Sequence, residues 1–302
     1  MFLKKVCIFL ALSFLAVDIL LLSLYIQATN NLSMLSDKML DNTVEYYSNA
    51  GIIIDKVDIV KRVPDNKIYI FNSDNAGAAK FTAERLCGQL FSKNAVVNMV
   101  ETPDGLSYSV SDNGKTAASL RIYSNSFGFE YVLGEYSDIA QTIPESQFFN
   151  DGVEISDENE KAVSRFMKAL CGGNIKNCEI TGSYYSDKKL YVSVSQIVDE
   201  KCPVDGMFFN AVVDEGKLLC AEGNIILSAV VKSCSEPLYD GVNALNKVDS
   251  SIVKEFVSEK IVYTHRYAGN DVYYLIPMWK IEYIDVNGKS GTQYVDAIKT
   301  NM

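Results

Sequence analysis

A single apolar run near the start of the chain constrains the fold more than any other feature. Two lysines precede an uncharged stretch from Val6 to Ile26 that is interrupted once, by Asp18. About twenty residues at about 1.5 Å each make a helix roughly 30 Å long, which is enough to cross the hydrocarbon core of a bilayer. No comparable run follows. The sequence therefore predicts a cytoplasmic N-terminus over residues 1–5 and one transmembrane helix over residues 6–26.

The charges beside the run set its orientation. Lysines before it and acidic or neutral residues after it place the N-terminus in the cytoplasm and the rest of the chain outside the cell membrane. The alternative is a cleaved signal peptide, whose apolar region is shorter, about 7 to 15 residues, and ends in small residues. The one passable cleavage site, Ile26-Gln27-Ala28, has a large residue where a small one is preferred. An uncleaved single-pass anchor with extracellular C-terminal domains is the favoured interpretation.

Asp18 gives the predicted helix a polar face. An acidic side chain within a bilayer costs about 2.5 to 3.5 kcal/mol on insertion scales, so it usually faces a partner helix or is protonated. Residues at steps of three, four and seven share its face. A tolerated polar residue in an adequate anchor is one explanation, and a docking face for another membrane protein is the other. The candidate interface residues are Ala11, Leu15, Asp18, Leu22 and Tyr25.

Composition restricts the partners and the class of the outer part. The chain has 28 basic and 38 acidic residues and a net charge of −10, which argues against nucleic acid as a ligand. An apolar content of 48 %, with 18 tyrosines and 14 phenylalanines, is typical of folded, strand-rich domains.

The cysteines leave the redox state open. Cys7 lies in the apolar run, and Cys87, Cys171, Cys178, Cys202, Cys220 and Cys234 follow it. Cys171 and Cys178 flank a Gly-Gly turn and are positioned to close a small loop, while free thiols are the alternative. We expect no metal and no cofactor, because there is no Cys-x-x-Cys pair and only one histidine.

Periodicity predicts an α+β fold: one transmembrane helix, then two extracytoplasmic domains of antiparallel sheet with packed helices. The first domain spans residues 33–135, a linker 136–153, and the second domain 154–302, with a PepSY-like C-terminal part. Residues 35–50 and 155–170 read as helices with Ser and Asp at their starts. Residues 52–63 read as a strand, and residues 250–259 as a helix. Asp112-Asn113-Gly114, Glu215-Gly216 and Asn287-Gly288 mark hairpin turns.

The two capped helices suggest a weak internal repeat. Leu35-Ser36-Asp37 and Ile155-Ser156-Asp157 each open a helix that ends at glycine and is followed by a strand. We expect one helix-plus-sheet unit to follow each of them.

A search for catalytic chemistry favours a protein that is not an enzyme. His265, the single histidine, lies on a predicted strand and is expected to be a partly exposed strand residue rather than a general base. No nucleotide-binding or serine-hydrolase motif is present. A pair of carboxylates of the glycosidase type remains open, because spacing in sequence says little about space. In the pairs Tyr184-Tyr185, Phe208-Phe209 and Tyr273-Tyr274, one ring is expected to face the core and the other the surface.

At both ends the chain resembles the YycH/YycI-type extracytoplasmic regulators, and most closely the YycI type. The motifs are Leu35-Ser36-Asp37, Tyr46-Tyr47 and Gly51-Ile52 at the start, and Leu275-Ile276-Pro277-Met278-Trp279-Lys280-Ile281 with Tyr294-Val295-Asp296-Ala297 at the end. The C-terminal pattern also looks like the end of a PepSY-type module.

The resemblance implies regulation. Proteins of this type stand beside a membrane sensor histidine kinase of a two-component system that controls cell-wall metabolism, and they act with a sister single-pass regulator. Helix 6–26 would then contact the kinase, and the outer domains would contact the sister protein. The alternative is a membrane-tethered PepSY-like binding or protease-inhibiting protein that acts on an extracellular partner without a kinase.

Overall fold

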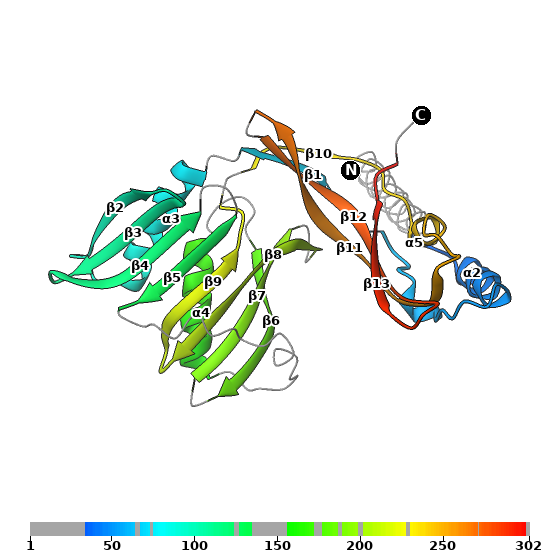
Figure 1. Cartoon of the computed structure of the whole chain (residues 1–302), viewed down its shortest axis with the longest axis horizontal. Helices are drawn as coiled ribbons and strands as arrows, with labels where there is room; N and C mark the ends of the chain where they lie inside the picture. Colours follow the sequence, from blue (N-terminus) through cyan, green and yellow to red (C-terminus); the bar gives the residue numbers. More distant parts are fainter. Residues whose placement is uncertain are drawn as a thin grey trace, which may run out of the picture. The chain divides into compact units, whose positions relative to one another are not determined.

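The computed structural model describes most of the chain beyond its N-terminal run (Figure 1). It is a sheet-rich α+β structure with few helices, as the sequence predicted in outline. The described residues are 34–63, 67–72, 75–123, 127–134, 156–171, 177–186, 189–198, 202–227, 230–270 and 272–299. Within these ranges no helix is long and apolar enough to span a bilayer. The predicted anchor at 6–26 and the linker at 136–153 lie outside them.

The chain divides into two compact units. Unit 1 comprises Met1–Asp65, Pro237–Lys260 and Trp279–Met302, and unit 2 comprises Asn66–Glu236 and Ile261–Met278. This division differs from the predicted one, in which a linker at 136–153 separates two consecutive domains. The difference arises because β5 (Gly128–Leu133) pairs with β9 (Lys217–Asn224), which places strands from both predicted domains in one sheet.

The main sheet of unit 2 is antiparallel throughout. Its order is β6–β7–β8–β9–β5–β4–β3–β2. The remaining strand bounds are β2 Val96–Thr102, β3 Gly105–Asp112, β4 Lys115–Tyr123, β6 Asn177–Ser186, β7 Lys189–Val198 and β8 Cys202–Asp214. Two predicted turns are confirmed: Asn113 and Gly114 join β3 to β4, and Glu215 and Gly216 join β8 to β9, all with positive φ.

The element order repeats within this sheet. A first half consists of α3 (Asn75–Leu90) followed by β2–β5, and a second half of α4 (Asp157–Leu170) followed by β6–β9. The halves join through their last strands, β5 and β9. The predicted repeat instead matched the helix at 35–50 with α4. In the structure that first helix is followed by a short 3₁₀ turn at Lys56–Asp58 and isolated bridges rather than by a meander.

Both helices cover the same face of the sheet and form the main core with it. Phe166 of α4 is fully buried between Phe129 and Phe209, whose ring centroids lie 6.4 and 5.8 Å from its own. Arg85 of α3 donates from Nε to the carbonyl oxygen of Ala169 at 2.9 Å, which satisfies one of the free carbonyls at the end of α4. Ser156 caps the start of α4 by accepting from the backbone N–H of Asn159.

A second set of strands in unit 2 surrounds a smaller core. β1 (Lys67–Asn72) lies between β10 (Val230–Ser235) and β12 (Val272–Asp285), and β12 lies beside β11 (Val253–Gly269). Phe71, Tyr263 and Leu275 are fully buried in this core. Gly269 and Asn270, between β11 and β12, both have positive φ, as in a hairpin turn.

Unit 1 contains α2 (Asp37–Asn49), α5 (Gly241–Leu245), the first part of β11, the last part of β12, and β13 (Ser290–Asp296), which pairs with β12. Trp279 is fully buried and donates from Nε1 to the carbonyl oxygen of Tyr239 at 3.1 Å. The predicted helix at 35–50 is confirmed, with Ser36 as its N-cap and Gly51 at φ 79° after its end.

Two local predictions for unit 1 are wrong. Residues 250–259 are not helical, because β11 begins at Val253. Apolar residues at 253, 256 and 257 have helical spacing, but pairing with β12 prevails over that local pattern. Residues 52–63 do not form a continuous strand; Ile53 and Arg62 make only isolated bridges around the 3₁₀ turn.

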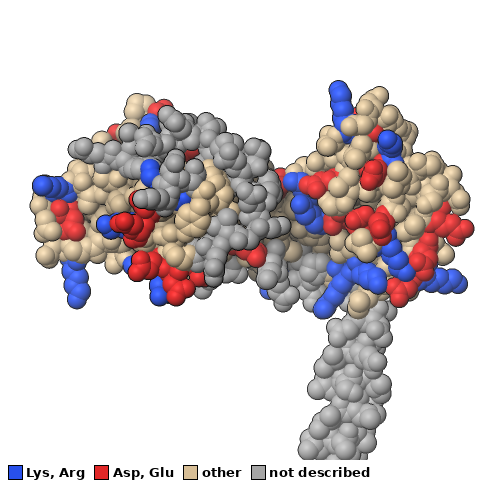
Figure 2. All heavy atoms as spheres, turned by 90° about the horizontal axis from the view of Figure 1, so that it is seen from below, with Lys and Arg blue, Asp and Glu red and all other residues tan. Residues whose placement is uncertain are grey.

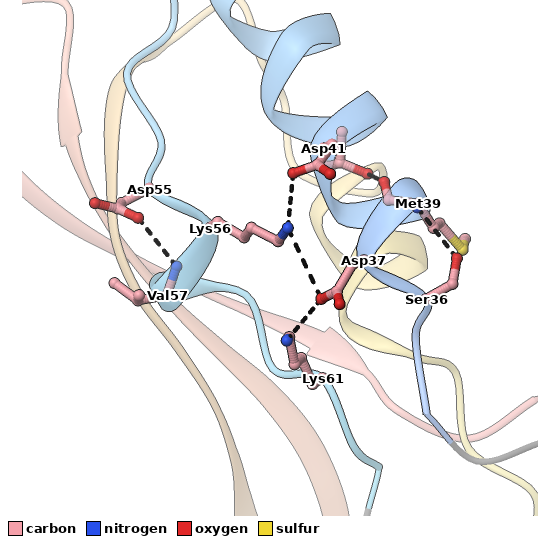
Figure 3. Close-up of polar contacts among 9 residues, drawn as sticks. Ser36, Asp37, Met39, Asp41, Asp55, Lys56, Val57 and Lys61 are labelled. Atoms are coloured by element: carbon pink, nitrogen blue, oxygen red, sulfur yellow. Dashed lines mark hydrogen bonds and ion pairs between the residues drawn. The ribbon is translucent and has the colours of Figure 1, made fainter. Parts of the chain in front are cut away.

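Exposed ion pairs hold that irregular segment beside α2 (Figure 3). Lys56 Nζ lies 2.7 Å from Asp41 Oδ1 and 3.8 Å from Asp37 Oδ1, and Lys61 Nζ lies 2.8 Å from Asp37 Oδ1. The lysines keep the pKa of the exposed Asp37 carboxyl below its ordinary value, chiefly through the Lys61 hydrogen bond. Because exposed pairs of this kind contribute little, we take them as orienting the segment rather than stabilising the unit.

The structure also joins Cys171 to Cys178 in a disulfide, which is one of the two states that the sequence left open for this pair. Among the described cysteines, Cys87, Cys202, Cys220 and Cys234 form no disulfide.

Candidate functional site

The residues predicted for the membrane interface are not part of the described structure. The first residue that the structure describes is residue 34, and all five candidates precede it: Ala11, Leu15, Asp18, Leu22 and Tyr25. Their proposed role remains a prediction from sequence.

The sheet face opposite to α3 and α4, here the cleft face, carries a polar row at the junction of the two halves. Arg121 of β4 lies opposite Glu130 of β5. Glu130 in turn lies opposite Glu222 of β9, and Glu222 lies opposite Asn210 of β8. Alternation explains their common direction: the adjacent Phe129 and Phe209 point into the helix-covered core. Four strands from both halves therefore present polar side chains side by side.

A cleft of about 490 Å³ opens on this row. It is lined by Tyr123, Gly128, Phe129, Glu130, Phe208, Asn210, Glu222, Gly223 and Asn224. All of these residues belong to unit 2. Phe208 is 39 % exposed and supplies an apolar wall, whereas its neighbour Phe209 is 1 % exposed. The site thus combines aromatic rings with carboxylate and amide groups.

Gly223 allows the backbones of β8 and β9 to approach closely at the cleft. A Cβ on Gly223, whose φ is +155°, would lie 2.2 Å from the carbonyl oxygen of Phe208 and 2.4 Å from the Cα of Phe209. Those neighbours are backbone atoms that cannot simply rotate away. Only glycine fits this position, so the local chain path that places Glu222 and Asn224 on the cleft face depends on it.

Two carboxylates meet at the centre of the cleft. Glu130 accepts a short hydrogen bond from the Tyr123 hydroxyl, and burial followed by that bond raises the pKa of Tyr123. Burial, and then the negative charge of Glu130, raises the pKa of Glu222 above its ordinary value. Within the described part of the chain, no lysine or arginine forms an ion pair with either carboxylate. Their charges repel one another across the junction.

The nearest basic residue along the row is engaged elsewhere. Arg121 Nη2 lies 3.0 Å from Asp104 Oδ2, and the Arg121 guanidinium carbon lies 5.1 Å from the Tyr123 ring centroid. Its Nε is buried and has no hydrogen-bond partner among the described residues. When Asp104 is counted with the row, the positive charge of Arg121 stands against three negative charges, those of Asp104, Glu130 and Glu222.

Asn210 leaves an acceptor unused beside the carboxylates. Its Oδ1 is shielded from solvent and has no partner within the described ranges. A shielded polar atom without a partner loses its hydration and gains nothing in return, which makes such atoms uncommon in folded proteins. The cleft thus contains more hydrogen-bond acceptors than donors.

His265 and the pair Tyr184-Tyr185, which the sequence singled out, lie outside the lining of the cleft. His265 is a partly exposed strand residue, as predicted; its ring lies 5.1 Å from that of Phe127 in an edge-to-face contact, and the partial desolvation of the imidazole lowers its pKa. Tyr184 is buried and stacks on Tyr191 at 4.8 Å, while Tyr185 is exposed, so the expected alternation is confirmed there. No group of three or more potential metal ligands occurs among the described residues.

Sequence reasoning did not single out Glu130, Glu222 or Asn210. They belong to no motif and lie on strands that are far apart in the chain. Only the register of β5 with β9 and of β8 with β9 brings them together. The exposed member of the Phe208-Phe209 pair was the single signal that pointed toward this face.

Acidic and basic side chains are mixed on one face of the described structure. On the face seen in Figure 2, acidic and basic side chains are interspersed over both units.

Comparisons with known proteins show similarity of shape only. No family model matches the chain, and no curated protein matches it. An uncharacterized protein from Eubacterium rectale is similar in structure, with a TM-score of 0.48 and 14 % identity over 80 % of this chain and 87 % of that one. The C-terminal domain of YpeB from Bacillus megaterium is another structural neighbour, with a TM-score of 0.32 and 9 % identity over 76 % of this chain and 95 % of that one.

Proposed function

We propose that this chain is a single-pass membrane protein whose extracytoplasmic units bind a partner and thereby regulate a membrane sensor histidine kinase that controls cell-wall metabolism. The observation that supports a binding role is the cleft at the β5–β9 junction, which presents unpaired acceptors and an exposed ring on a sheet face. The anchor at 6–26 would transmit the bound state to the kinase. A coupling of about 1 to 3 kcal/mol between two kinase states is sufficient.

The arrangement of the carboxylates favours binding over hydrolysis. In a glycosidase the two carboxyl groups flank the scissile bond. Glu130 and Glu222 instead project from neighbouring strands of the same sheet face, so they approach a ligand from one side. Glu130 is also held by the Tyr123 hydroxyl. We therefore propose that the protein is not an enzyme.

The proposal requires a specific contact at the anchor. We expect a photo-reactive residue at position 22, on the Asp18 face, to crosslink the full-length chain to a sensor histidine kinase in its native membrane. The same group at position 20, on the opposite face of the helix, should give little adduct. Asp18→Leu should keep the protein in the membrane but lower the adduct yield about fivefold or more, the factor that roughly 1 kcal/mol of interhelical hydrogen bonding gives. Mass spectrometry of the adducts provides the measurement.

The opposite result identifies the alternative. Replacing residues 6–26 by an unrelated membrane helix should abolish regulation if the anchor contacts the kinase. If the exchanged protein retains its function and no kinase adduct forms at position 22, the kinase model is wrong. The outer units would then act alone, as in a membrane-tethered PepSY-like binding or protease-inhibiting protein.

A further inference from the structure

The β5–β9 cleft has an excess of acceptors and of negative charge, and this restricts what it can hold. Glu130 and Glu222 face one another in register, and neither forms an ion pair with a lysine or arginine in the described part of the chain, since the neighbouring Arg121 pairs with Asp104. Asn210 adds a shielded oxygen without a partner. A neutral or anionic ligand would leave the carboxylates uncompensated. A cationic ligand with several N–H donors would compensate both carboxylates at once.

The aromatic residues narrow the class further. Tyr123 and Phe208 line the cleft together with the acceptors. A guanidinium group is planar, carries five N–H donors in a fixed fork and stacks on aromatic faces, whereas an ammonium group is a compact, strongly hydrated charge. The Tyr123 ring already has the Arg121 guanidinium carbon at 5.1 Å, so this cleft shows the same contact with the chain's own arginine.

From these observations we infer that the cleft binds a guanidinium group, supplied by an arginine side chain of a partner protein, between Tyr123 and Phe208 and against Glu130 and Glu222. This inference rests on the proposed binding function and gives it a ligand chemistry. The cleft volume of about 490 Å³ is within the range of ordinary small-ligand sites, so an arginine side chain with its flanking backbone fits.

Titration of the full-length chain in detergent with acetyl-Gly-Arg-Gly-amide tests the inference by calorimetry. We expect saturable binding, and at least tenfold weaker binding by the variant E130Q/E222Q. The matched variant E84Q/E179Q changes the net charge equally at exposed positions on α3 and β6 and should bind as the wild type does. Acetyl-Gly-Lys-Gly-amide should bind more weakly than the arginine peptide. If the natural ligand is an arginine within a polypeptide, free guanidinium should bind more weakly than either peptide.

A single substitution separates recognition from folding. The Glu222 side chain forms no hydrogen bond or ion pair within the described residues, and its charge repels that of Glu130. Glu222→Gln should therefore raise the melting temperature while it weakens peptide binding. A merely structural role for Glu222 would move both quantities in the same direction. Equal binding of the arginine peptide by wild type and E130Q/E222Q overturns the inference, as does saturable binding of Ca²⁺ alone that excludes the peptide. The crosslink at position 22 is independent of these results, so failure here leaves the kinase proposal to be judged separately.

Discussion

Glu259 is a buried carboxylate in unit 1 that forms no ion pair with a described lysine or arginine. It is 7 % exposed on β11, accepts from the backbone N–H of Val60 at 3.0 Å through Oε2, and leaves Oε1 without a partner in the described structure. Burial raises its pKa to about 7, the negative charge of Asp240 adds to the rise, and the Val60 bond opposes it. Gly241 makes room for it, because a Cβ there would lie 2.4 Å from Oε2.

This carboxylate predicts a pH dependence of unit 1. The folded chain holds the Glu259 proton up to about pH 7, whereas the unfolded chain loses it near the ordinary value of 4.5. Between these values the unfolded state binds fewer protons, so the free energy of unfolding should fall as pH rises, by up to about 3 kcal/mol in total. Glu259→Gln is neutral and keeps an acceptor for Val60, so it should remove this fall. Fluorescence of Trp279, the only tryptophan, measures unfolding of unit 1.

The partly exposed Glu255 on the same strand provides the control. Glu255→Gln should keep the wild-type dependence on pH. If the Glu259→Gln and wild-type curves stay parallel from pH 4.5 to 7, the buried carboxylate is not the cause.

The elements of unit 2 depend on one position where no side chain fits. In Gly223→Ala the new Cβ would meet the backbone of Phe208 and Phe209. We expect β8 and β9 to separate locally and the unit to lose more than about 2 kcal/mol, together with arginine-peptide binding. Gly88→Ala on α3 meets no atom within 4 Å and has no unusual φ, so it should stabilise by up to about 1 kcal/mol through helix propensity. Differential scanning calorimetry of both variants decides; similar melting temperatures would contradict the role given to Gly223.

Local signals predicted the elements well where the chain itself determines them. The cap at Ser36, the stop at Gly51 and the turns at Asn113-Gly114 and Glu215-Gly216 depend on the φ preferences and side-chain bonds of a few neighbouring residues. The start of β11 was mistaken for a helix because Val253 and Phe256 have helical spacing, while its strand state depends on pairing with β12. Long-range register has no such local signal, and the cleft depends on register alone.

At the scale of the whole molecule, the disulfide bears on the compartment. Cys171 and Cys178 are bonded across a sequence separation of seven residues, between the end of α4 and the start of β6. A disulfide persists in an oxidising environment, which an extracytoplasmic position provides. In the chain-entropy model, closing so short a loop raises the free energy of unfolding by about 2 kcal/mol.

Protein isolated from its native membrane under alkylating conditions should therefore carry the Cys171–Cys178 bond. Reduction, or the variant C171S/C178S, should lower the melting temperature of unit 2 and leave the Trp279 signal of unit 1 unchanged. Cys234→Ser, at a partly exposed cysteine without a disulfide, controls for loss of a thiol. Recovery of both cysteines as free thiols would contradict the outer location.

The junction of β5 with β9 has a further consequence. Each half contributes its last strand, and antiparallel pairing of equivalent strands is how two identical subunits associate about a twofold axis. The main sheet is thus organised like a homodimer whose two copies have become one polypeptide. Glu130 and Glu222 face each other because they occupy the strands nearest that pseudo-axis. In a true homodimer a substitution appears in both copies, whereas in a single polypeptide either half of the binding site can be substituted without the other.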